Sequence, residues 1–307
     1  MFIVKNRKIF IALSSFLVVA SLVLLSVFGL KLGIDFKGGA LTEVKYATRP
    51  SVEQLHPKLD ALGIGEVLVQ STGENGYIVK TRELTQDERS ALMEVLSEKN
   101  TSPITDTTYS SIGPSVGKEL TRKAIILIIL VSLMIVTFIA YAFRGVSQQI
   151  ASWKYGVIAI VTLLHDVIIP VGIFTVLSHF YGAEVDTLFV VAILTVLGLS
   201  VSDTIVVFDR IRENLHSEHA EKKDVSFADV VGKSLSQVYT RSINTSLTII
   251  VVLLALFFFG PESTRYFALM LTAGMFFGTY SSIFLASPLL VTWEQYTQKK
   301  ALAAEKK

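Results

Sequence analysis

Cysteine is absent from this sequence of 307 residues, so neither a disulfide framework nor thiol chemistry is available to it. An excess of one charge is lacking as well. The 28 basic and 26 acidic residues leave a net charge of +2, which is too small and too dispersed for binding nucleic acid. The sequence therefore predicts no nucleic-acid partner.

Long apolar runs dominate the sequence instead. Hydrophobic residues make up 51% of it, the mean hydropathy is +0.56, and the charged residues gather in blocks between the apolar runs. A helical crossing of a bilayer needs roughly 20 apolar residues. The sequence thus predicts a polytopic α-helical membrane protein with six transmembrane helices, at Ile9–Leu30, Ala124–Phe143, Gly156–Leu177, Leu188–Phe208, Tyr239–Phe259 and Ala268–Leu290.

The first apolar segment follows basic residues, as in a signal peptide, but it is long enough to span and has no small-x-small cleavage site. We expect it to remain as an anchor. With the N-terminus inside, the short outer loops contain only Arg265 as a basic residue, so both termini are expected in the cytoplasm. This orientation gives an N-terminus with the first helix (1–30), an outer domain (31–123), five further helices (124–292) and a cytoplasmic tail (293–307).

The outer interval 31–123 reads as a small folded domain. Strand and helix signals alternate in the order βαββαβ, which is the ferredoxin-like α+β arrangement. The strands are expected in "LTEVKY", "EVLVQ", "GYIVKT" and "TDTTYSSI", and the helices in "SVEQLHPKLDALGI" and "TQDERSALMEVLSEKN". Capping boxes at Ser51 and Thr85 mark the helix starts, and Asn75-Gly76 is a hairpin signal. With no evident metal, nucleophile or phosphate motif, the domain serves in binding or mechanics, or is a passive cap.

Two carboxylates lie inside apolar segments. Asp203, in "LSVSDTIVVFDR", is the sixteenth of 21 residues in its segment, roughly 7 to 8 Å from the cytoplasmic end. A charged Asp in mid-membrane costs about 2.5–3.5 kcal/mol, and such groups usually mark ion or proton paths. The alternative is a structural hydrogen bond or an interfacial position. Asp166 lies near the middle of the third segment beside His165, for which a structural role is an equally good interpretation.

A polar stripe opens the fifth segment. Its members are spaced i, i+3, i+4 and i+7 and therefore share one helical face: Arg241, Asn244, Thr245 and Thr248. Such a face should meet protein or water, although Arg241 alone could extend to the inner interface.

Small residues recur every fourth position in the sixth segment, at Gly274, Gly278 and Ser282. This pattern predicts a close helix–helix contact. The interval 209–237 is interpreted as a solvated, amphipathic cytoplasmic connector, and its two histidines, without cysteine, give only weak evidence for a metal. We expect no metal or other cofactor.

Three motifs together resemble the SecD/SecF family of protein-export membrane proteins. They are "GIDFKGG" with Gly33, Asp35, Gly38 and Gly39, "SVSDTIVVFDRIREN" with Asp203, Asp209 and Arg210, and "TRSINTSLT" with Arg241. The resemblance covers essentially the whole chain. It departs from the commoner "YSINDTIVVFDR" at Leu199, Val201 and Ser202. The family belongs to the resistance-nodulation-division superfamily, whose members draw on an ion gradient through intramembrane carboxylates.

The resemblance implies a non-enzymatic role in the bacterial inner membrane. The chain would pair with SecD, associate with the SecYEG translocon and YajC, and use the proton motive force to assist export of unfolded secretory polypeptides. Asp203 and Arg241 match the family positions tied to ion conduction, and Asp166 matches a motif whose role is less defined. We favour H⁺ over Na⁺ as the coupling ion, because no cluster of extra carboxylates or carbonyl-rich break suggests a Na⁺ cage.

Two other classes are compatible with intramembrane aspartates. An aspartyl protease needs two carboxylates that share a proton about 3 Å apart, and its usual G-x-G-D context is absent around Asp166 and Asp203. A small-molecule exporter of the same superfamily usually holds two six-span halves. The sequence contains one half without an internal repeat, so we expect a partner to supply the other.

Overall fold

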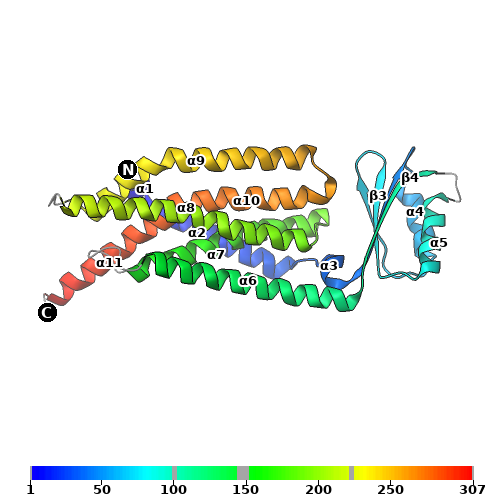
Figure 1. Cartoon of the computed structure of the whole chain (residues 1–307), viewed down its shortest axis with the longest axis horizontal. Coiled ribbons are helices and arrows are strands. Elements are labelled where there is room, and N and C mark those ends of the chain that lie inside the picture. The colour runs from blue at the N-terminus through cyan, green and yellow to red at the C-terminus, as the bar shows by residue number, and fades with distance from the viewer. Residues whose placement is uncertain (1, 99–101, 144–151, 221–224, 306–307) are drawn as a thin grey trace. The chain divides into compact units, whose positions relative to one another are not determined.

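The computed structural model describes residues 2–98, 102–143, 152–220 and 225–305. It contains two compact units, which Figure 1 draws as a ribbon. One unit comprises Met1–Leu30, Leu127–Ala183 and Leu188–Lys307, and the other comprises Lys31–Ile126 with Glu184–Thr187.

Six helices of the described chain are long and apolar enough to cross a membrane, as the sequence predicts. They follow a short N-terminal helix α1 (Phe2–Lys5) and account for every predicted apolar segment. The six are α2 (Arg7–Phe28), α6 (Pro114–Ala142), α7 (Ser152–Tyr181), α8 (Thr187–Ala220), α9 (Phe227–Phe259) and α10 (Arg265–Ser281), the last of which continues through a π-helical turn η3 (Ser282–Ala286) into α11 (Ser287–Glu305). A short 3₁₀ turn, η2 (Glu262–Thr264), precedes α10.

Helices α7, α8 and α10 supply most of the core of the helical unit. About half of the apolar stretch of each is buried, whereas α2, α6 and α9 are mostly exposed. Large apolar side chains cover the exposed surface of α6, among them Ile129, Leu133 and Phe138. Such surfaces suit lipid or other membrane helices. Helix α1 and the C-terminal part of α11 lie at the same end of this unit, as an even number of crossings requires (Figure 1).

A buried ion pair joins two distant parts of the helical unit. Lys154, at the start of α7, lies 2.9 Å from Glu294 of α11, and both side chains are 9% exposed. The Lys154 ammonium also donates to Thr297 Oγ1 at 3.2 Å. Next to this pair, Trp153 and Trp293 pack edge to face with ring centroids 5.2 Å apart. Helix α11 is thereby fixed to the third membrane helix, α7.

The second unit is an α+β domain with the predicted order of elements. Its members are α3 (Ile34–Lys37), β1 (Gly39–Tyr46), α4 (Val52–Asp60), β2 (Leu68–Thr72), β3 (Gly76–Thr81), α5 (Gln86–Leu96) and β4 (Ile104–Ile112). The sheet order is β2-β3-β1-β4 and all neighbouring strands are antiparallel. This is the ferredoxin-like topology. Helices α4 and α5 cover one face of the sheet (Figure 1), and Val44, Leu55, Tyr77 and Leu92 are buried between the layers.

Two local predictions for this domain have different outcomes. The hairpin predicted from Asn75-Gly76 is confirmed between β2 and β3, with Asn75 in a loop at 73–75 and Gly76 already paired with Thr72. Gly73, with φ of +55°, takes the left-handed conformation that the bend requires. Ser51 is the N-cap residue of α4, but its side chain makes no capping bond. The predicted box at Ser51 is therefore wrong.

The second capping box is confirmed. Thr85 accepts from the backbone N–H of Glu88 at 3.3 Å, and the Glu88 carboxylate accepts from the Thr85 N–H at 2.9 Å. The hydrogen bond from Arg82 and then those from Thr85 lower the pKa of Glu88 to about 2, so this box stays ionised and formed at ordinary pH.

The interval 209–237 is not an open connector. Helix α8 extends to Ala220 and α9 begins at Phe227, so this interval is mostly two antiparallel helical extensions; residues 221–224 and the side chain of His219 lie outside the described part. Asn214 donates to Ser234 Oγ and to Gln237 Oε1, both at 2.8 Å. The apolar residues at helical spacing, such as Ile211 and Leu235, are buried in this pairing.

Candidate functional site: two carboxylates among the membrane helices

Asp203 is held by hydroxyl groups of two neighbouring helices. Its Oδ2 accepts from Thr279 Oγ1 of α10 at 3.1 Å and from Ser246 Oγ of α9 at 3.5 Å. The two hydroxyl oxygens are 2.5 Å apart. The carboxylate itself is only half-buried within this chain. Three helices thus meet at one titratable group.

Asp166 of α7 forms a second cluster and is completely buried. Its Oδ2 accepts from Ser200 Oγ of α8 and from Ser281 Oγ of α10, the latter at 2.7 Å. Its Oδ1 lies 2.7 Å from His165 Nδ1. His165 Nε2 is buried without a hydrogen-bond partner among the described residues, and the ring stacks on Tyr280 at a centroid distance of 6.2 Å. A neutral histidine that donates from Nδ1 to Asp166 satisfies this geometry.

The two clusters share helices α8 and α10. On α8, Ser200 and Asp203 are one turn apart, and on α10 Thr279 and Ser281 lie two residues apart. Each carboxylate therefore accepts a hydrogen bond from α10, and α8 contributes to both clusters. A change of charge at either Asp would alter contacts that position the same pair of helices.

Glycines allow α8 and α10 to approach closely. A Cβ atom added to Gly274 would lie 2.1 Å from Val196 Cγ2, and one added to Gly278 would lie 3.2 Å from Ser200 Cβ. The first distance is impossible without a shift, and the second is tight. The small-residue pattern of the sixth apolar segment thus lies at the contact that brings Thr279 to Asp203.

The polar stripe of α9 lies on a different face from Ser246. All four of its members are exposed within this chain: Arg241, Asn244, Thr245 and Thr248. The buried hydroxyls of this helix are those of Ser234, Ser242 and Ser246. In the part of the chain that the structure describes, Arg241 forms no ion pair with Asp203 or any other acid. The fold therefore brings Asp203 to Ser246 and Thr279 and leaves Arg241 outside this contact.

The remaining motif residues of α8 lie beyond Asp203 on the exposed extension of the helix. Asp209 pairs with Arg212 at 3.6 Å, and Arg210 pairs with Glu213 at 2.8 Å. These are ion pairs within one turn on a solvent-accessible surface, which contribute little stability. They form no part of either carboxylate cluster.

The glycine pair of "GIDFKGG" marks a tight passage at the start of β1. Gly38 has a φ of +81°, and a Cβ there would lie 2.8 Å from Pro114 Cα. Gly39 has a φ of +148°, and its Cβ would lie 2.6 Å from the carbonyl oxygen of Thr81. Only glycine accommodates both the conformation and the close approach.

The other two residues of this motif contact the segment before α8. Gly33 donates its N–H to the Val185 carbonyl at 2.8 Å. Asp35 Oδ2 accepts from the backbone N–H of Thr187, the first residue of α8, also at 2.8 Å. Among the described residues, no group of three or more His, Asp or Glu side chains could hold a metal ion.

Comparison with known proteins places the chain in a family. The model of the SecD/SecF C-terminal family of protein export membrane proteins matches residues 92–296, and the SecD/SecF GG motif matches residues 23–48. The chain belongs to the SecF family of protein translocase subunits. SecF of Thermobaculum terrenum is 41% identical over 303 residues, which cover 95% of this chain and 93% of that protein. The role of this family is transport, and this chain is a multi-pass membrane protein.

Members in which SecD and SecF are joined match over only part of their length. SecDF of Bacillus subtilis is 34% identical over 96% of this chain, which spans 38% of that protein. The crystal structure of SecDF from Thermus thermophilus, described as a translocon-associated membrane protein, superposes with a TM-score of 0.81 at 29% identity. The superposition covers 95% of this chain and 38% of the SecDF chain from Thermus thermophilus.

Several residues of the SecF site escape sequence reasoning. Ser200, Ser246, Thr279 and Ser281 hold the two carboxylates, yet none stands out from the sequence. Their shared signal is a hydroxyl group in the interior of an apolar segment. Hydroxyl groups inside a helix commonly donate to a backbone carbonyl of the same helix. Ser246 Oγ also does so, to the Ser242 carbonyl at 2.8 Å. The residue type alone therefore does not identify which hydroxyl contacts a carboxylate.

Proposed function

We propose that this chain is the SecF subunit of a SecDF complex that uses the proton motive force to assist Sec-dependent export of unfolded polypeptides across the inner membrane. The observation that carries the proposal is the environment of Asp203, a carboxylate within a membrane helix that hydroxyl groups from two other helices contact. Intramembrane carboxylates that face other helices usually belong to ion or proton paths.

The hydroxyl partners suit a group that changes its protonation state. A Ser or Thr hydroxyl can donate to an ionised carboxylate, and it can equally accept from a protonated one. Thr279 and Ser246 can therefore hold Asp203 in both states by rotating their hydroxyl hydrogens. A backbone N–H or a lysine ammonium can only donate, so neither could accept the O–H hydrogen of the protonated acid.

We propose H⁺ rather than Na⁺ as the coupling ion. Sodium sites in transporters commonly use carbonyl oxygens that an unwound helix exposes. Helix α8 is continuous from Thr187 to Ala220, so its carbonyls near Asp203 are engaged in the helix. The described oxygen groups at Asp203 are two hydroxyls, which suffice to bind a protonated acid.

The exposed polar residues support SecD as the partner that completes the site. Asp203 is only half-buried, and the stripe from Arg241 to Thr248 is exposed on a membrane helix. Polar groups in a bilayer need a protein or water partner. A second set of membrane helices packed against α8 and α9 would supply it, and the longer SecDF chains contain room for such a half.

Arg241 would act from this partner-facing side. In general, burial favours the protonated form of a carboxyl group, whereas an approaching guanidinium favours the ionised form. A carboxylate that alternates between a proton and Arg241 couples proton passage to helix movement. Moving one elementary charge through 100 mV supplies about 2.3 kcal/mol per step. Asp166 would serve as a further proton-relay group, and its protonation would respond to movement of α8 and α10, because it accepts hydrogen bonds from both.

The α+β domain, residues 31–123, would lie in the periplasm and both termini in the cytoplasm. From there the domain would move against those of SecD and keep the chain emerging from SecYEG, with YajC nearby, from sliding back. The absence of Lys and Arg from the loop near 178–187, against the many in the opposite loops, supports this orientation.

The proposal is tested with Asp203→Asn, which keeps the size and hydrogen bonding of the side chain but removes its titratable charge. In inverted membrane vesicles that contain SecD and SecYEG, we expect normal insertion and ATP-driven export. The part of export that an uncoupler abolishes should be lost. Arg241→Met should give the same defect, and the double variant should be little worse than either single one, because the two residues act as a unit.

Full uncoupler-sensitive export by Asp203→Asn would make Asp203 a structural hydrogen-bonding group and end the proton-relay proposal. Repeating the assay with a collapsed sodium gradient and an intact proton gradient separates the two ions. If export loses its gradient-dependent part when only the sodium gradient is collapsed, the coupling ion is Na⁺.

A further inference from the structure

The structure has a junction at the edge of the α+β domain where two distant segments meet. One is residues 31–38, which carry the motif that precedes β1, and the other is residues 184–187, which precede and begin α8. Both belong to the same compact unit as the domain. Leu32 and Val185 form an isolated parallel bridge, with hydrogen bonds from Gly33 N to the Val185 carbonyl and from Val185 N to the Lys31 carbonyl, both at 2.8 Å.

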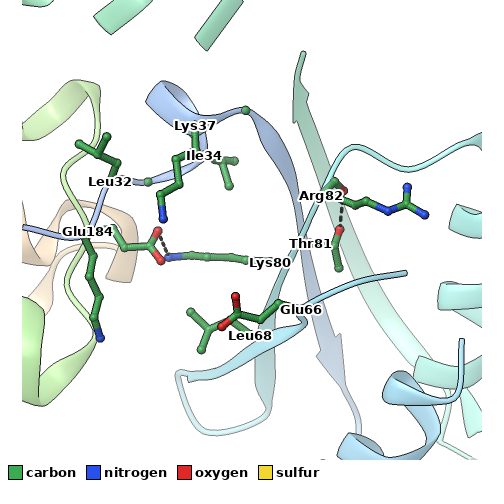
Figure 2. A pocket seen from close by; sticks show the side chains of 12 residues that line it. Leu32, Ile34, Lys37, Glu66, Leu68, Lys80, Thr81, Arg82 and Glu184 are labelled. Carbon is green, nitrogen blue, oxygen red and sulfur yellow. Dashed lines mark hydrogen bonds and ion pairs between the residues drawn. The ribbon is translucent and has the colours of Figure 1, made fainter. Parts of the chain in front are cut away.

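Side chains reinforce this junction on both flanks. Asp35 of α3 accepts from the Thr187 N–H at 2.8 Å. Lys80 of β3 forms an ion pair with Glu184 at 2.8 Å, and both side chains are less than one-fifth exposed. Figure 2 shows Lys80 and Glu184 extending toward each other across the pocket, with Leu32 and Lys37 beside them. The sheet and residues 31–38 thus both contact the residues that precede and begin α8.

The junction also reaches the second membrane helix. Gly117 in the first turns of α6 packs so closely on the motif segment that an added Cβ would lie 2.9 Å from Phe36 O and from Gly38 N. Thr121 Oγ1 donates to Phe36 O at 3.4 Å. The segment follows α2 after two residues, so the outer ends of three membrane helices converge on about eight residues.

Helix α8 is the element that links this junction to the proton-relay site. It runs without interruption from Thr187, which Asp35 holds, to Ala220. Asp203 follows Thr187 by sixteen residues, which is roughly 24 Å along the helix axis at 1.5 Å per residue. A continuous helix can carry an axial shift or rotation from one end to the other, because it is a rigid element. The interaction of the Asp35 carboxylate with the start of α8 is further favoured by the helix dipole.

Hydrogen bonds and the ion pair of Lys80 with Glu184 connect the segments that meet at the junction. A pocket of about 500 Å³ opens beside them and is lined by Ile34, Lys37, Lys80 and Glu184, among others. These polar contacts therefore lie beside open space. Hydrogen bonds of this kind can transmit movement from one segment to the other while the angle between the two segments changes.

We propose that Asp35 is a coupling residue, whose hydrogen bond to Thr187 transmits movement of the Asp203-bearing helix α8 to the α+β domain. This inference rests on the proposed function, because it requires that Asp203 drives α8. Asp35 is a positioning residue rather than part of the proton path. Its removal should therefore separate proton uptake from export instead of abolishing both.

The test measures two quantities in vesicles with the full complex: proton movement that requires Asp203, and uncoupler-sensitive export. Asp35→Ala should leave the first unchanged and lower the second about fivefold, the equilibrium factor typical of a lost helix N-cap hydrogen bond. Asp35→Asn, which keeps an acceptor oxygen, should retain most of the export. Thr85→Ala removes an N-cap of α5 elsewhere in the domain and serves as the matched control, with export unchanged.

A covalent replacement of the lost contact makes the test independent of overall stability. The chain has no cysteine, so Leu32→Cys with Val185→Cys introduces a single defined pair at the parallel bridge. Neighbouring strands lie about 4.8 Å apart, within disulfide reach. In the Asp35→Ala chain, oxidation should restore export and reduction should remove it again.

The outcomes separate the two proposals. If Asp35→Ala leaves export unchanged, lowers proton movement and export together, or is not rescued by the disulfide, the coupling role is overturned. If Asp203→Asn retains both proton movement and export, the proposed function fails. In that case the disulfide itself still tests the role of Asp35, because its formation needs no transport. The cysteine pair is reduced and then oxidised, with and without Asp35→Ala, and the yield of the disulfide reports whether Asp35 holds the junction together.

Discussion

At the scale of single residues, the site of this chain is a set of hydroxyl groups around two acids. Asp203 and Asp166 are visible in the sequence as charges within apolar segments. Their partners are not, since a hydroxyl at the right depth becomes informative only when packing brings three helices together. The sequence therefore predicts the acids and their importance, and it leaves their coordination to the fold.

Thr279 offers the sharpest test at this scale. Thr279→Val keeps the shape of the side chain and removes a hydrogen bond of 3.1 Å to Asp203. Because a hydrogen bond to a charged group contributes about 1.5–3 kcal/mol, we expect uncoupler-sensitive export to fall roughly tenfold. Thr279→Ser should restore it. Export in inverted vesicles, with and without the uncoupler, is the measurement.

Thr272 provides a matched control on the same helix. Its hydroxyl donates to the Ala268 carbonyl within α10 at 2.7 Å. Thr272→Val should leave export unchanged. Equal behaviour of the two valine variants would mean that the hydroxyl contact of Thr279 with Asp203 has no part in coupling.

Elements were predictable where one physical pattern dominates. Runs of apolar residues longer than the bilayer requires give the membrane helices, and alternation with turn signals gives the four strands in their observed order. The interval 209–237 was correctly interpreted as amphipathic, but its helices were not predicted. They carry charge on their outer faces, while the buried apolar residues recur at helical spacing. An amphipathic helical hairpin and a solvated connector share the same composition.

The contact between α8 and α10 gives a prediction for this scale. Gly274→Ala would place a Cβ 2.1 Å from Val196 Cγ2, so the Val196 side chain or the two helices must shift. Overpacking of this kind costs about 1–3 kcal/mol. We expect a lower melting temperature of the complex in detergent and a lower yield. A second change, Val196→Ala, should recover most of the loss by making room.

Gly198 of α8 is the comparison for this experiment. A Cβ there would meet nothing within 4 Å, so Gly198→Ala should leave the melting temperature unchanged or raise it slightly through helix propensity. If Gly274→Ala is tolerated as well as Gly198→Ala, the two helices do not rely on close contact at this point.

At the scale of the whole molecule, the distribution of basic residues predicts which side each unit occupies. Asn75 lies exposed in the hairpin loop of the α+β domain, and Ser217 lies exposed on the extension of α8. Because the chain has no cysteine, Asn75→Cys and Ser217→Cys each introduce one thiol. An impermeant thiol reagent on intact cells should label only position 75, as judged by the mass of the labelled protein.

Permeabilised cells supply the control, in which both positions should react. Labelling of position 217 alone in intact cells would invert the orientation and place the α+β domain in the cytoplasm. Asn214, although nearby, is unsuited to this test because its side chain is buried and bonded to Ser234.

The buried pair of Lys154 and Glu294 also sets an order of events during synthesis. The two residues are 140 positions apart, so at about 5–20 residues per second the lysine waits roughly 7 to 30 seconds for its acid. Throughout that interval an unpaired ammonium would be costly to bury. The start of the third helix must therefore remain hydrated until α11 has been synthesised, and the bundle closes at that end only after α11 has joined it.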